Sequence, residues 1–224
     1  MISAILNVLF PRICFGCGSE GTYICGECLR KINLVPFSFC PNCKALTHRG
    51  EFCFVCAKDF ELDGLIVCAK YEDGVLKEAI HEFKYDRVFD IGKILGLLLV
   101  EKLKLEYVGG CLIIPIPLSK NRLASRGFNQ AEILAKVVSE QVGLPLISNT
   151  LDRTKNKKPQ AELSREKRIK NLEGCFRWSG GDLSGAKILL IDDVATTGAT
   201  INECAKVLKN NGAGEVWGLV LAHG

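Results

Sequence analysis

The sequence lacks any uninterrupted apolar run that approaches the ~20 residues of a membrane-spanning helix. Its longest candidate, Ile91–Val100, is interrupted by Gly92, Lys93 and Gly96. The apolar start at Ile2–Phe10 lacks a basic flank and a small-residue cleavage site, so we do not expect a secretory signal. These absences predict a cytoplasmic protein with no stable insertion into a membrane.

A large net charge is also missing. The chain has 29 basic and 25 acidic residues, and its net charge of +4 is too small to indicate nucleic-acid binding by itself. Hydrophobic residues make up 48% and charged residues 24%, which are ordinary globular values and exclude wholesale disorder. At roughly 150 residues per domain, the 224 residues correspond to one or two domains.

Cysteine, by contrast, is abundant: eight of the twelve cysteines lie between Cys14 and Cys56. They form four C-x-x-C knuckles, and such pairs in a reducing compartment bind metal more often than they form disulfides. The short spacer lets both sulfurs of a knuckle face one ion, and two knuckles complete the four-thiolate set that zinc prefers. The pattern therefore predicts two structural zinc ions, bound by Cys14, Cys17, Cys25, Cys28, Cys40, Cys43, Cys53 and Cys56.

The pairing of the knuckles stays open at this point. Spacers of seven, eleven and nine residues allow either neighbouring knuckles or nested knuckles to share an ion. A set of disulfides is the alternative to metal. We expect residues 1–59 to form a double zinc-ribbon head. The remaining cysteines are expected to be buried small hydrophobic residues: Cys68, Cys111, Cys175 and Cys204.

Beyond residue 60, apolar strand patterns alternate with helical patterns. This alternation predicts an α/β domain with a mostly parallel sheet over residues 60–224. The expected strands are Leu65–Tyr71, Cys111–Ile116, Lys187–Ile191 and Glu215–Ala222. The expected helices are Gly74–Lys84, Ile91–Lys104, Asn129–Val142 and Thr200–Asn210.

One strand end gathers the residues that carry chemistry. The strand is followed by Asp192 and Asp193, and then by a loop of small and hydroxyl residues, Ala195–Thr200, that opens a helix. Backbone N–H groups, threonine hydroxyls and a helix N-terminus are the elements of a phosphate cradle. The two carboxylates suit ribose hydroxyls, directly or through Mg²⁺. Because a Walker lysine is absent, we expect a phosphorylated sugar rather than a nucleoside triphosphate; an acidic pair that merely caps the helix is the structural alternative.

The segment ILLIDDVATTGAT resembles the phosphoribosyl-pyrophosphate (PRPP) signature of type I phosphoribosyltransferases. The cysteine-rich head and three further segments extend the resemblance to the ComF family of competence-type proteins: Pro115–Gln130 (PIPLSKNRLASRGFNQ), His81–Tyr85 (HEFKY), and Gln160–Asn171 leading into Gly174–Phe176. The resemblance implies a type I phosphoribosyltransferase-like α/β domain with a small N-terminal double zinc ribbon.

The resemblance also implies roles for individual residues. Asp192 and Asp193 would hold the ribose 2′- and 3′-hydroxyls. The 5′-phosphate would be bound by Ala195, Thr196, Thr197, Gly198, Ala199 and Thr200. The turn against the pyrophosphate would be formed by Ile116, Pro117, Leu118 and Ser119, with a strained or cis peptide, and Lys84 would reach the phosphates. Contacts to anions or a partner would come from Arg122, Arg126 and Asn129.

The segment Arg153–Lys170 resembles the mobile lid of this fold. It holds eight basic and two acidic residues, a net charge of +6, which could attract pyrophosphate or a nucleic-acid backbone.

The resemblance favours a PRPP- and Mg²⁺-binding protein that serves DNA uptake in natural transformation. Its zinc head would help to contact DNA-uptake proteins or single-stranded DNA. One alternative is a metabolic phosphoribosyltransferase that moves phosphoribose from PRPP to an unidentified amine or base. A second alternative is a structural zinc adaptor with a vestigial pocket. The hood that binds the acceptor base in better-known phosphoribosyltransferases has no evident counterpart here, so the sequence names no catalytic residue.

Overall fold

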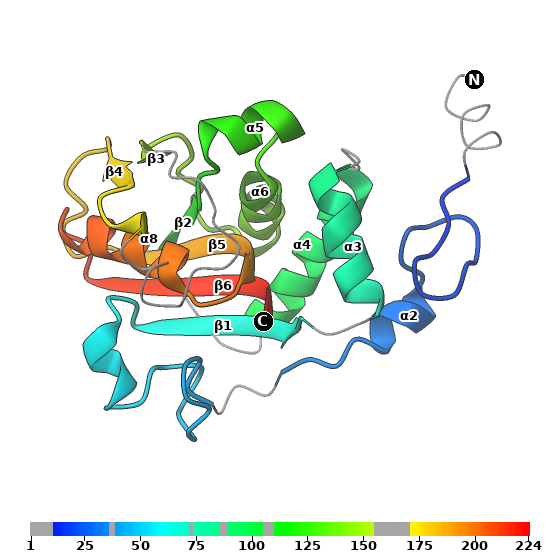
Figure 1. Cartoon of the computed structure of the whole chain (residues 1–224), viewed down its shortest axis with the longest axis horizontal. Helices are drawn as coiled ribbons and strands as arrows, with labels where there is room; N and C mark the ends of the chain where they lie inside the picture. Colours follow the sequence, from blue (N-terminus) through cyan, green and yellow to red (C-terminus); the bar gives the residue numbers. More distant parts are fainter. Residues whose placement is uncertain (1–10, 36–38, 72–73, 86–88, 105–109, 155–170) are drawn as a thin grey trace.

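A four-stranded parallel sheet lies at the centre of the protein, in a computed structural model that describes residues 11–35, 39–71, 74–85, 89–104, 110–154 and 171–224 (Figure 1). The strand order is β1-β6-β5-β2, and every neighbouring pair is parallel. The strands are β1 (Gly64–Lys70), β2 (Cys111–Pro115), β5 (Lys187–Ala195) and β6 (Glu215–His223). The predicted α/β class with a mostly parallel sheet is confirmed.

The strand β5 is longer than the apolar run Lys187–Ile191 that we expected. It continues through the acidic pair to Ala195 because it pairs with β6 beyond the apolar segment, with Asp192 opposite Val220 and Ala195 opposite His223. Backbone pairing therefore fixes the position of both carboxylates, which the hydrophobic pattern alone did not indicate.

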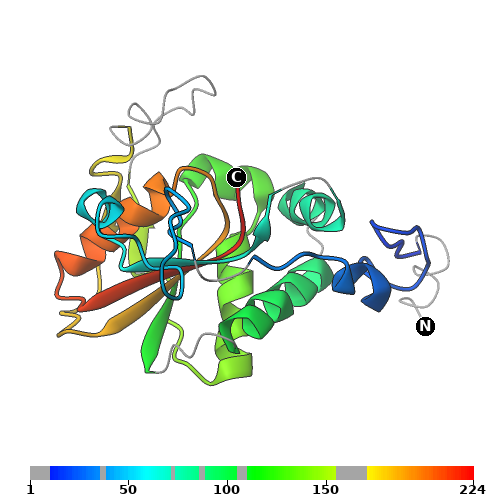
Figure 2. The same cartoon turned by 90° about the horizontal axis from the view of Figure 1, so that it is seen from below.

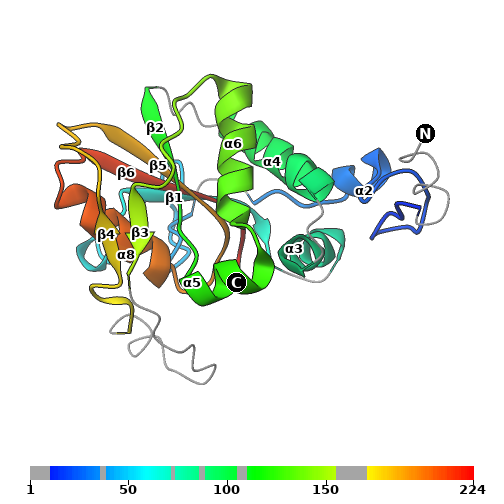
Figure 3. The same ribbon diagram turned by 90° about the horizontal axis from the view of Figure 1, so that it is seen from above.

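Helices cover both faces of the sheet (Figure 3). One face is covered by α3 (Val75–Tyr85), α4 (Phe89–Lys104) and α6 (Gln130–Val142). The opposite face is covered by α8 (Ala199–Lys209) and a short antiparallel hairpin of β3 (Leu151–Arg153) and β4 (Phe176–Trp178). These helices lie close to the ranges that the sequence predicts; the helix α5 (Lys120–Arg126) was not among the expected elements.

The first pair of knuckles, Cys14–Cys28, packs against the end of the body that carries α3 and α4; we call it the first cluster. It contains the short helix α2 (Gly26–Arg30). Cys14, Ile24 and Cys28 are buried in the same core as the residues of α3 and α4, and Arg12 forms an ion pair of 2.7 Å with Asp90.

The second pair of knuckles, Cys40–Cys56, lies below β1 in Figure 1, well away from the first cluster, and Figure 2 shows the same separation; we call it the second cluster. It ends in a 3₁₀ helix, η1 (Cys56–Asp59). The backbone N–H of Leu65 donates to the carbonyl of Gly50 at 3.0 Å, and the N–H of Val35 donates to the carbonyl of Cys68 at 2.8 Å. The second cluster and the chain that leads into it are thus bound to the outer edge of β1, an edge that would otherwise be left unpaired.

The isolated cysteines Cys68, Cys111, Cys175 and Cys204 are all buried, as predicted. Among the residues that the structure describes, no helix combines the length and the apolar composition needed to cross a membrane.

Candidate sugar-phosphate site

The carboxyl ends of β2 and β5 lie side by side at one edge of the sheet. Pro115, the last residue of β2, is paired with Ile191, and the N–H of Ile116 donates to the carbonyl of Ile191 at 2.9 Å. Asp192 follows immediately. The register therefore brings the acidic pair of β5 next to the turn Ile116–Ser119, at the edge where open α/β sheets bind ligands.

The two carboxylates are held by backbone and side-chain groups. Asp192 Oδ1 accepts a hydrogen bond from the N–H of Asp193 at 2.8 Å, and Asp193 Oδ1 accepts one from Val194 at 2.7 Å. Lys84, at the end of α3, forms an ion pair of 3.3 Å with Asp193 Oδ2. The side chains of this pair are 20% and 13% exposed, so the contact is only partly screened by water.

Burial raises the pKa of the Asp192 carboxyl to about 8, and the neighbouring charge of Asp193 acts in the same direction. The N–H of Asp193 and the charges of Lys84 and Arg122 oppose this rise in the pKa. A carboxyl with such a pKa is largely protonated at neutral pH, and cations or hydroxyl donors that bind its charged form lower its pKa again.

The loop Ala195–Thr200 leads into the N-terminus of α8. Gly198 is the N-cap residue and has a left-handed backbone with φ of 71°. Among the described residues no side chain caps the helix at this position, although the Thr197 hydroxyl accepts a hydrogen bond from Ala199 N–H at 3.4 Å. Exposed N–H groups at the positive end of a helix dipole attract anions, so this loop has the form of a phosphate cradle.

The turn Ile116–Ser119 is supported by polar side chains. The amide of Asn129 donates to the carbonyl of Ile116 at 3.0 Å, and its oxygen accepts a hydrogen bond from Ala131 N–H at the start of α6. Ser119 caps α5 by accepting a hydrogen bond from the N–H of Arg122 at 3.4 Å.

The expectation of a strained or cis peptide in this turn is wrong. The described residues contain no cis peptide bond, and none of the four residues of the turn has a positive φ. The contacts of Asn129 and Ser119 hold the turn in ordinary backbone geometry.

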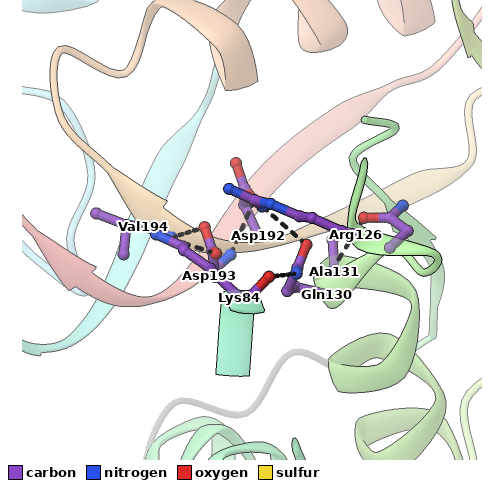
Figure 4. Close-up of polar contacts among 8 residues, drawn as sticks. Lys84, Arg126, Gln130, Ala131, Asp192, Asp193 and Val194 are labelled. Carbon is purple, nitrogen blue, oxygen red and sulfur yellow. Dashed lines mark hydrogen bonds and ion pairs between the residues drawn. The ribbon is translucent and has the colours of Figure 1, made fainter. Parts of the chain in front are cut away.

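A buried amide that the sequence did not single out connects three of these elements. Gln130, only 2% exposed, accepts a hydrogen bond from Arg126 at 3.0 Å and donates one to the carbonyl of Lys84 at 3.5 Å (Figure 4). Since Lys84 in turn contacts Asp193, the amide links α5 and α6 to the acidic pair. The sequence did contain a signal for a buried role of Gln130: this polar residue lies one turn before Leu134, on the apolar face of the predicted helix.

The remaining predicted anion contacts lie around the same edge. The Arg122 side chain is exposed, yet its positive charge opposes the rise in the pKa of Asp192. Arg153, which we had counted only as part of the lid, lies in β3 with its guanidinium 5.4 Å from the centre of the Phe176 ring. Burial lowers the pKa of Arg153; the charge of Arg122 adds to this effect and that of Asp192 opposes it. The rest of the predicted lid, residues 155–170, lies outside the described residues.

The eight cysteines of the knuckles form two groups of four, in which the sulfurs lie within 4.8 Å of one another. Neighbouring knuckles share a group, which resolves the pairing: Cys14, Cys17, Cys25 and Cys28 form one, and Cys40, Cys43, Cys53 and Cys56 form the other. The distances Cys17 Sγ–Cys25 Sγ and Cys43 Sγ–Cys53 Sγ are both 3.6 Å. Zn–S bonds of ~2.3 Å in a tetrahedron place sulfurs about 3.8 Å apart, so each group could hold a zinc ion.

The backbone of the first group favours a thiolate. Burial raises the pKa of the Cys14 thiol, but hydrogen bonds from the N–H groups of Cys25, Gly16 and Cys17 outweigh burial and lower the pKa to about 6. In the second group the balance is the same at Cys40, whose pKa is lowered to about 7.

The pKa is also lowered at Cys17, by its hydrogen bond with Ser19, and at Cys53, by the backbone N–H of Cys56. Burial raises the pKa of Cys28 to about 12. At Cys56 the Asn42 amide lowers the pKa, but burial and the neighbouring cysteines outweigh it and raise the pKa to about 12. Since metals bind the thiolate, each group contains two cysteines whose lowered pKa favours metal binding.

Comparison with known proteins agrees with this geometry. The model of the phosphoribosyl transferase domain matches residues 123–223. Competence protein F of Haemophilus influenzae is 32% identical over 214 residues, which cover 89% of this chain and 90% of that protein. DNA utilization protein YhgH of Escherichia coli K12 is 33% identical over 222 residues, with 92% and 96% covered. Competence protein ComFC of Streptococcus pneumoniae is 31% identical over 200 residues, with 88% and 86% covered.

Replacing Gln130 tests the buried link. The substitution Gln130→Leu removes both hydrogen bonds and leaves the Lys84 carbonyl and the Arg126 guanidinium without them. We expect the free energy of unfolding to fall by about 1–3 kcal/mol, measured by urea denaturation. The control is Gln141→Leu on the exposed face of the same helix. Equal effects of the two substitutions would contradict a supporting role for the Gln130 amide.

Proposed function

The chain belongs to the ComF family of competence proteins, and from this premise we propose that it binds PRPP with Mg²⁺ and serves DNA uptake in natural transformation. The observation that carries the proposal is that two acidic side chains, a helix N-terminus with glycine as its N-cap residue, and a supported turn meet at one edge of the sheet. Those three parts match the three parts of PRPP, a ribose, a 5′-phosphate and a pyrophosphate.

In this proposal the ribose binds through Asp192 and Asp193. Carboxylates accept hydrogen bonds from vicinal hydroxyls. The backbone bonds to Oδ1 of each residue, and the ion pair of Asp193 Oδ2 with Lys84, fix the orientation of the two carboxylates. The 5′-phosphate lies in the loop formed by Ala195, Thr196, Thr197, Gly198, Ala199 and Thr200, against the N-terminus of α8.

The pyrophosphate of the ligand then faces the turn formed by Ile116, Pro117, Leu118 and Ser119. Lys84 and Arg122 supply positive charge there, and Arg126 and Asn129 support the turn and its flanking helices. Oxygens of the acidic pair are ligands of the kind that Mg²⁺ accepts. When bound, Mg²⁺ would offset the negative charge of the pyrophosphate.

We further propose that both four-cysteine groups bind zinc and stabilise a head of residues 1–59, next to a phosphoribosyltransferase-like domain of residues 60–224. Tetrahedral sulfur spacing and lowered thiol pKa values support zinc. The names of the relatives, competence and DNA utilization proteins, support contact with DNA-uptake proteins or single-stranded DNA. Such work would take place in the cytoplasm.

Removing the acidic charges tests PRPP binding. The double substitution Asp192→Asn and Asp193→Asn keeps the side-chain volumes but removes charge-assisted hydrogen bonds worth about 1.5–3 kcal/mol each. We expect the affinity for PRPP in the presence of Mg²⁺, measured by calorimetry, to fall at least tenfold. The exposed Asp182→Asn is the matched control. Undiminished affinity in the double variant would place the ligand elsewhere.

The raised pKa of Asp192 predicts a pH dependence. Below its pKa of about 8 the carboxyl is protonated, so a ligand that needs the carboxylate must displace a proton. The affinity for Mg²⁺ and PRPP should rise from pH 6.5 to 8 and then level off, with proton release detected by calorimetry in two buffers. In the Asp192→Asn variant, the affinity should still rise with pH only as far as deprotonation of the ligand's own phosphates causes it to rise. An identical profile in both proteins would refute the role of Asp192.

Genetic complementation tests the biological role. A strain that lacks the gene should lose natural transformation and keep its ordinary growth requirements. The wild-type gene should restore transformation, and the Asp192→Asn, Asp193→Asn gene should not, at equal protein levels. Normal transformation combined with a new requirement for a purine, a pyrimidine or an amino acid would instead support a metabolic phosphoribosyltransferase.

A further inference from the structure

The two cysteine clusters are attached to different parts of the α/β body. The first cluster packs on α3 and α4, where Cys14 and Cys28 join their core and Arg12 contacts Asp90. The second cluster continues directly into the chain that packs on α8, the helix whose N-terminus forms the phosphate cradle. The clusters therefore differ in what they can influence.

The chain that leaves the second cluster is fastened to both ends of α8. The side-chain oxygen of Asn202, in the first turn of α8, accepts hydrogen bonds from the N–H groups of Glu61 at 2.7 Å and Leu62 at 3.3 Å. At the other end of α8, Lys209 forms an ion pair of 3.0 Å with Asp63. A displacement of the segment after Cys56 would thus be transmitted to the helix and its N-terminal loop.

A small cavity of about 170 Å³ separates the second cluster from the phosphate loop. Its walls on the cluster side include Asn42, Phe52 and Phe60, and the facing wall is formed by Thr196, Thr197 and Gly198. Phe52 and Phe60 stack with ring centres 4.1 Å apart. Phe60 lies so close that a Cβ atom placed on Gly198 would be 3.7 Å from its ring.

One residue of this cavity also contacts the cysteine group. The Asn42 amide donates to the sulfur of Cys56 at 3.2 Å while the residue lines the cavity. In the first cluster a side-chain hydrogen bond of the same length runs from Cys17 Sγ to Ser19 Oγ, at 3.2 Å, and Ser19 is exposed. Hydrogen bonds of this kind hold a metal ligand in place and tune its affinity.

We propose that the second cluster is a wall of the sugar-phosphate site, and that the zinc bound there is coupled to occupancy of the phosphate loop, whereas the zinc of the first cluster is not. The inference rests on the proposed function. Coupling between two sites is reciprocal: if zinc in the second cluster strengthens PRPP binding, then PRPP strengthens the binding of that zinc by the same factor. Since only the second cluster lines the cavity beside the loop, the ligand should distinguish between two chemically identical ions.

A zinc competition experiment tests the coupling. Purified full-length protein, first shown by elemental analysis to contain two zinc ions, is titrated with a chromophoric chelator in Mg²⁺, with and without PRPP. We expect PRPP to increase the affinity of one zinc ion at least fivefold, within the usual range of coupling, and to leave the other unchanged. An equal shift of both ions, or of neither, would overturn the proposal.

Two matched variants assign the ions to the clusters. Asn42→Ala removes the amide that donates to Cys56 Sγ, and Ser19→Ala removes the hydroxyl that accepts from Cys17 Sγ; both variants keep all eight cysteines. Each should weaken one zinc ion, by about 10–100-fold. Only Asn42→Ala should weaken PRPP binding, and saturating zinc should restore it. A loss of PRPP affinity in Ser19→Ala alone, or a loss in Asn42→Ala that zinc does not restore, would refute the coupling.

Failure of this inference is distinguishable from failure of the proposed function. Calorimetry of the wild-type protein with Mg²⁺ and PRPP reports on the sugar-phosphate site alone. If the wild-type protein binds PRPP but the ligand does not select one zinc ion, only the wall and its coupling are rejected. If the wild-type protein does not bind PRPP, the proposed function is rejected and the inference with it.

Discussion

The pairing of β5 between β2 and β6 is the interaction on which the rest of the structure depends. It carries the acidic pair beyond the apolar part of the strand and holds it at a defined register, with Asp192 opposite Val220. The same ladder places the turn after β2 beside the carboxylates and starts the loop that leads to α8. Each part of the proposed ligand site is therefore positioned by one sheet edge rather than by separate loops.

Holding two carboxylates at a half-buried position has an energetic cost, which appears in the raised pKa of Asp192. Lys84, itself fastened through the Gln130 amide, and the backbone N–H groups of Asp193 and Val194 offset part of it. A carboxyl that resists ionisation beside a second carboxylate is suited to a ligand that brings hydroxyl donors and a divalent cation, since both stabilise its charged form. PRPP with Mg²⁺, the ligand that we propose, has both of these features.

Local patterns in the sequence were sufficient to predict the four strands of the parallel sheet, the main helices and the four C-x-x-C knuckles, because each depends on residue spacing. The pairing of the knuckles required distances between sulfurs. The contact between Asn202 and Glu61 joins residues that no local pattern relates, so the attachment of the second cluster to α8 was not foreseen. The amide of Gln130 was missed since its partners lie on α5 and α3. The cis peptide expected from the resemblance is not found, since the turn Ile116–Ser119 has neither a cis bond nor a positive φ.

Hydrogen–deuterium exchange with and without PRPP, at constant Mg²⁺, would test the central claim most directly, because it reports on the whole chain at once. The account predicts protection of residues 192–200 and 116–119, together with residues 40–62 of the second cluster and its exit segment. Residues 12–32 of the first cluster should exchange equally in both conditions. Protection confined to the first cluster, or no change at residues 192–200, would contradict a sugar-phosphate site at the end of β5.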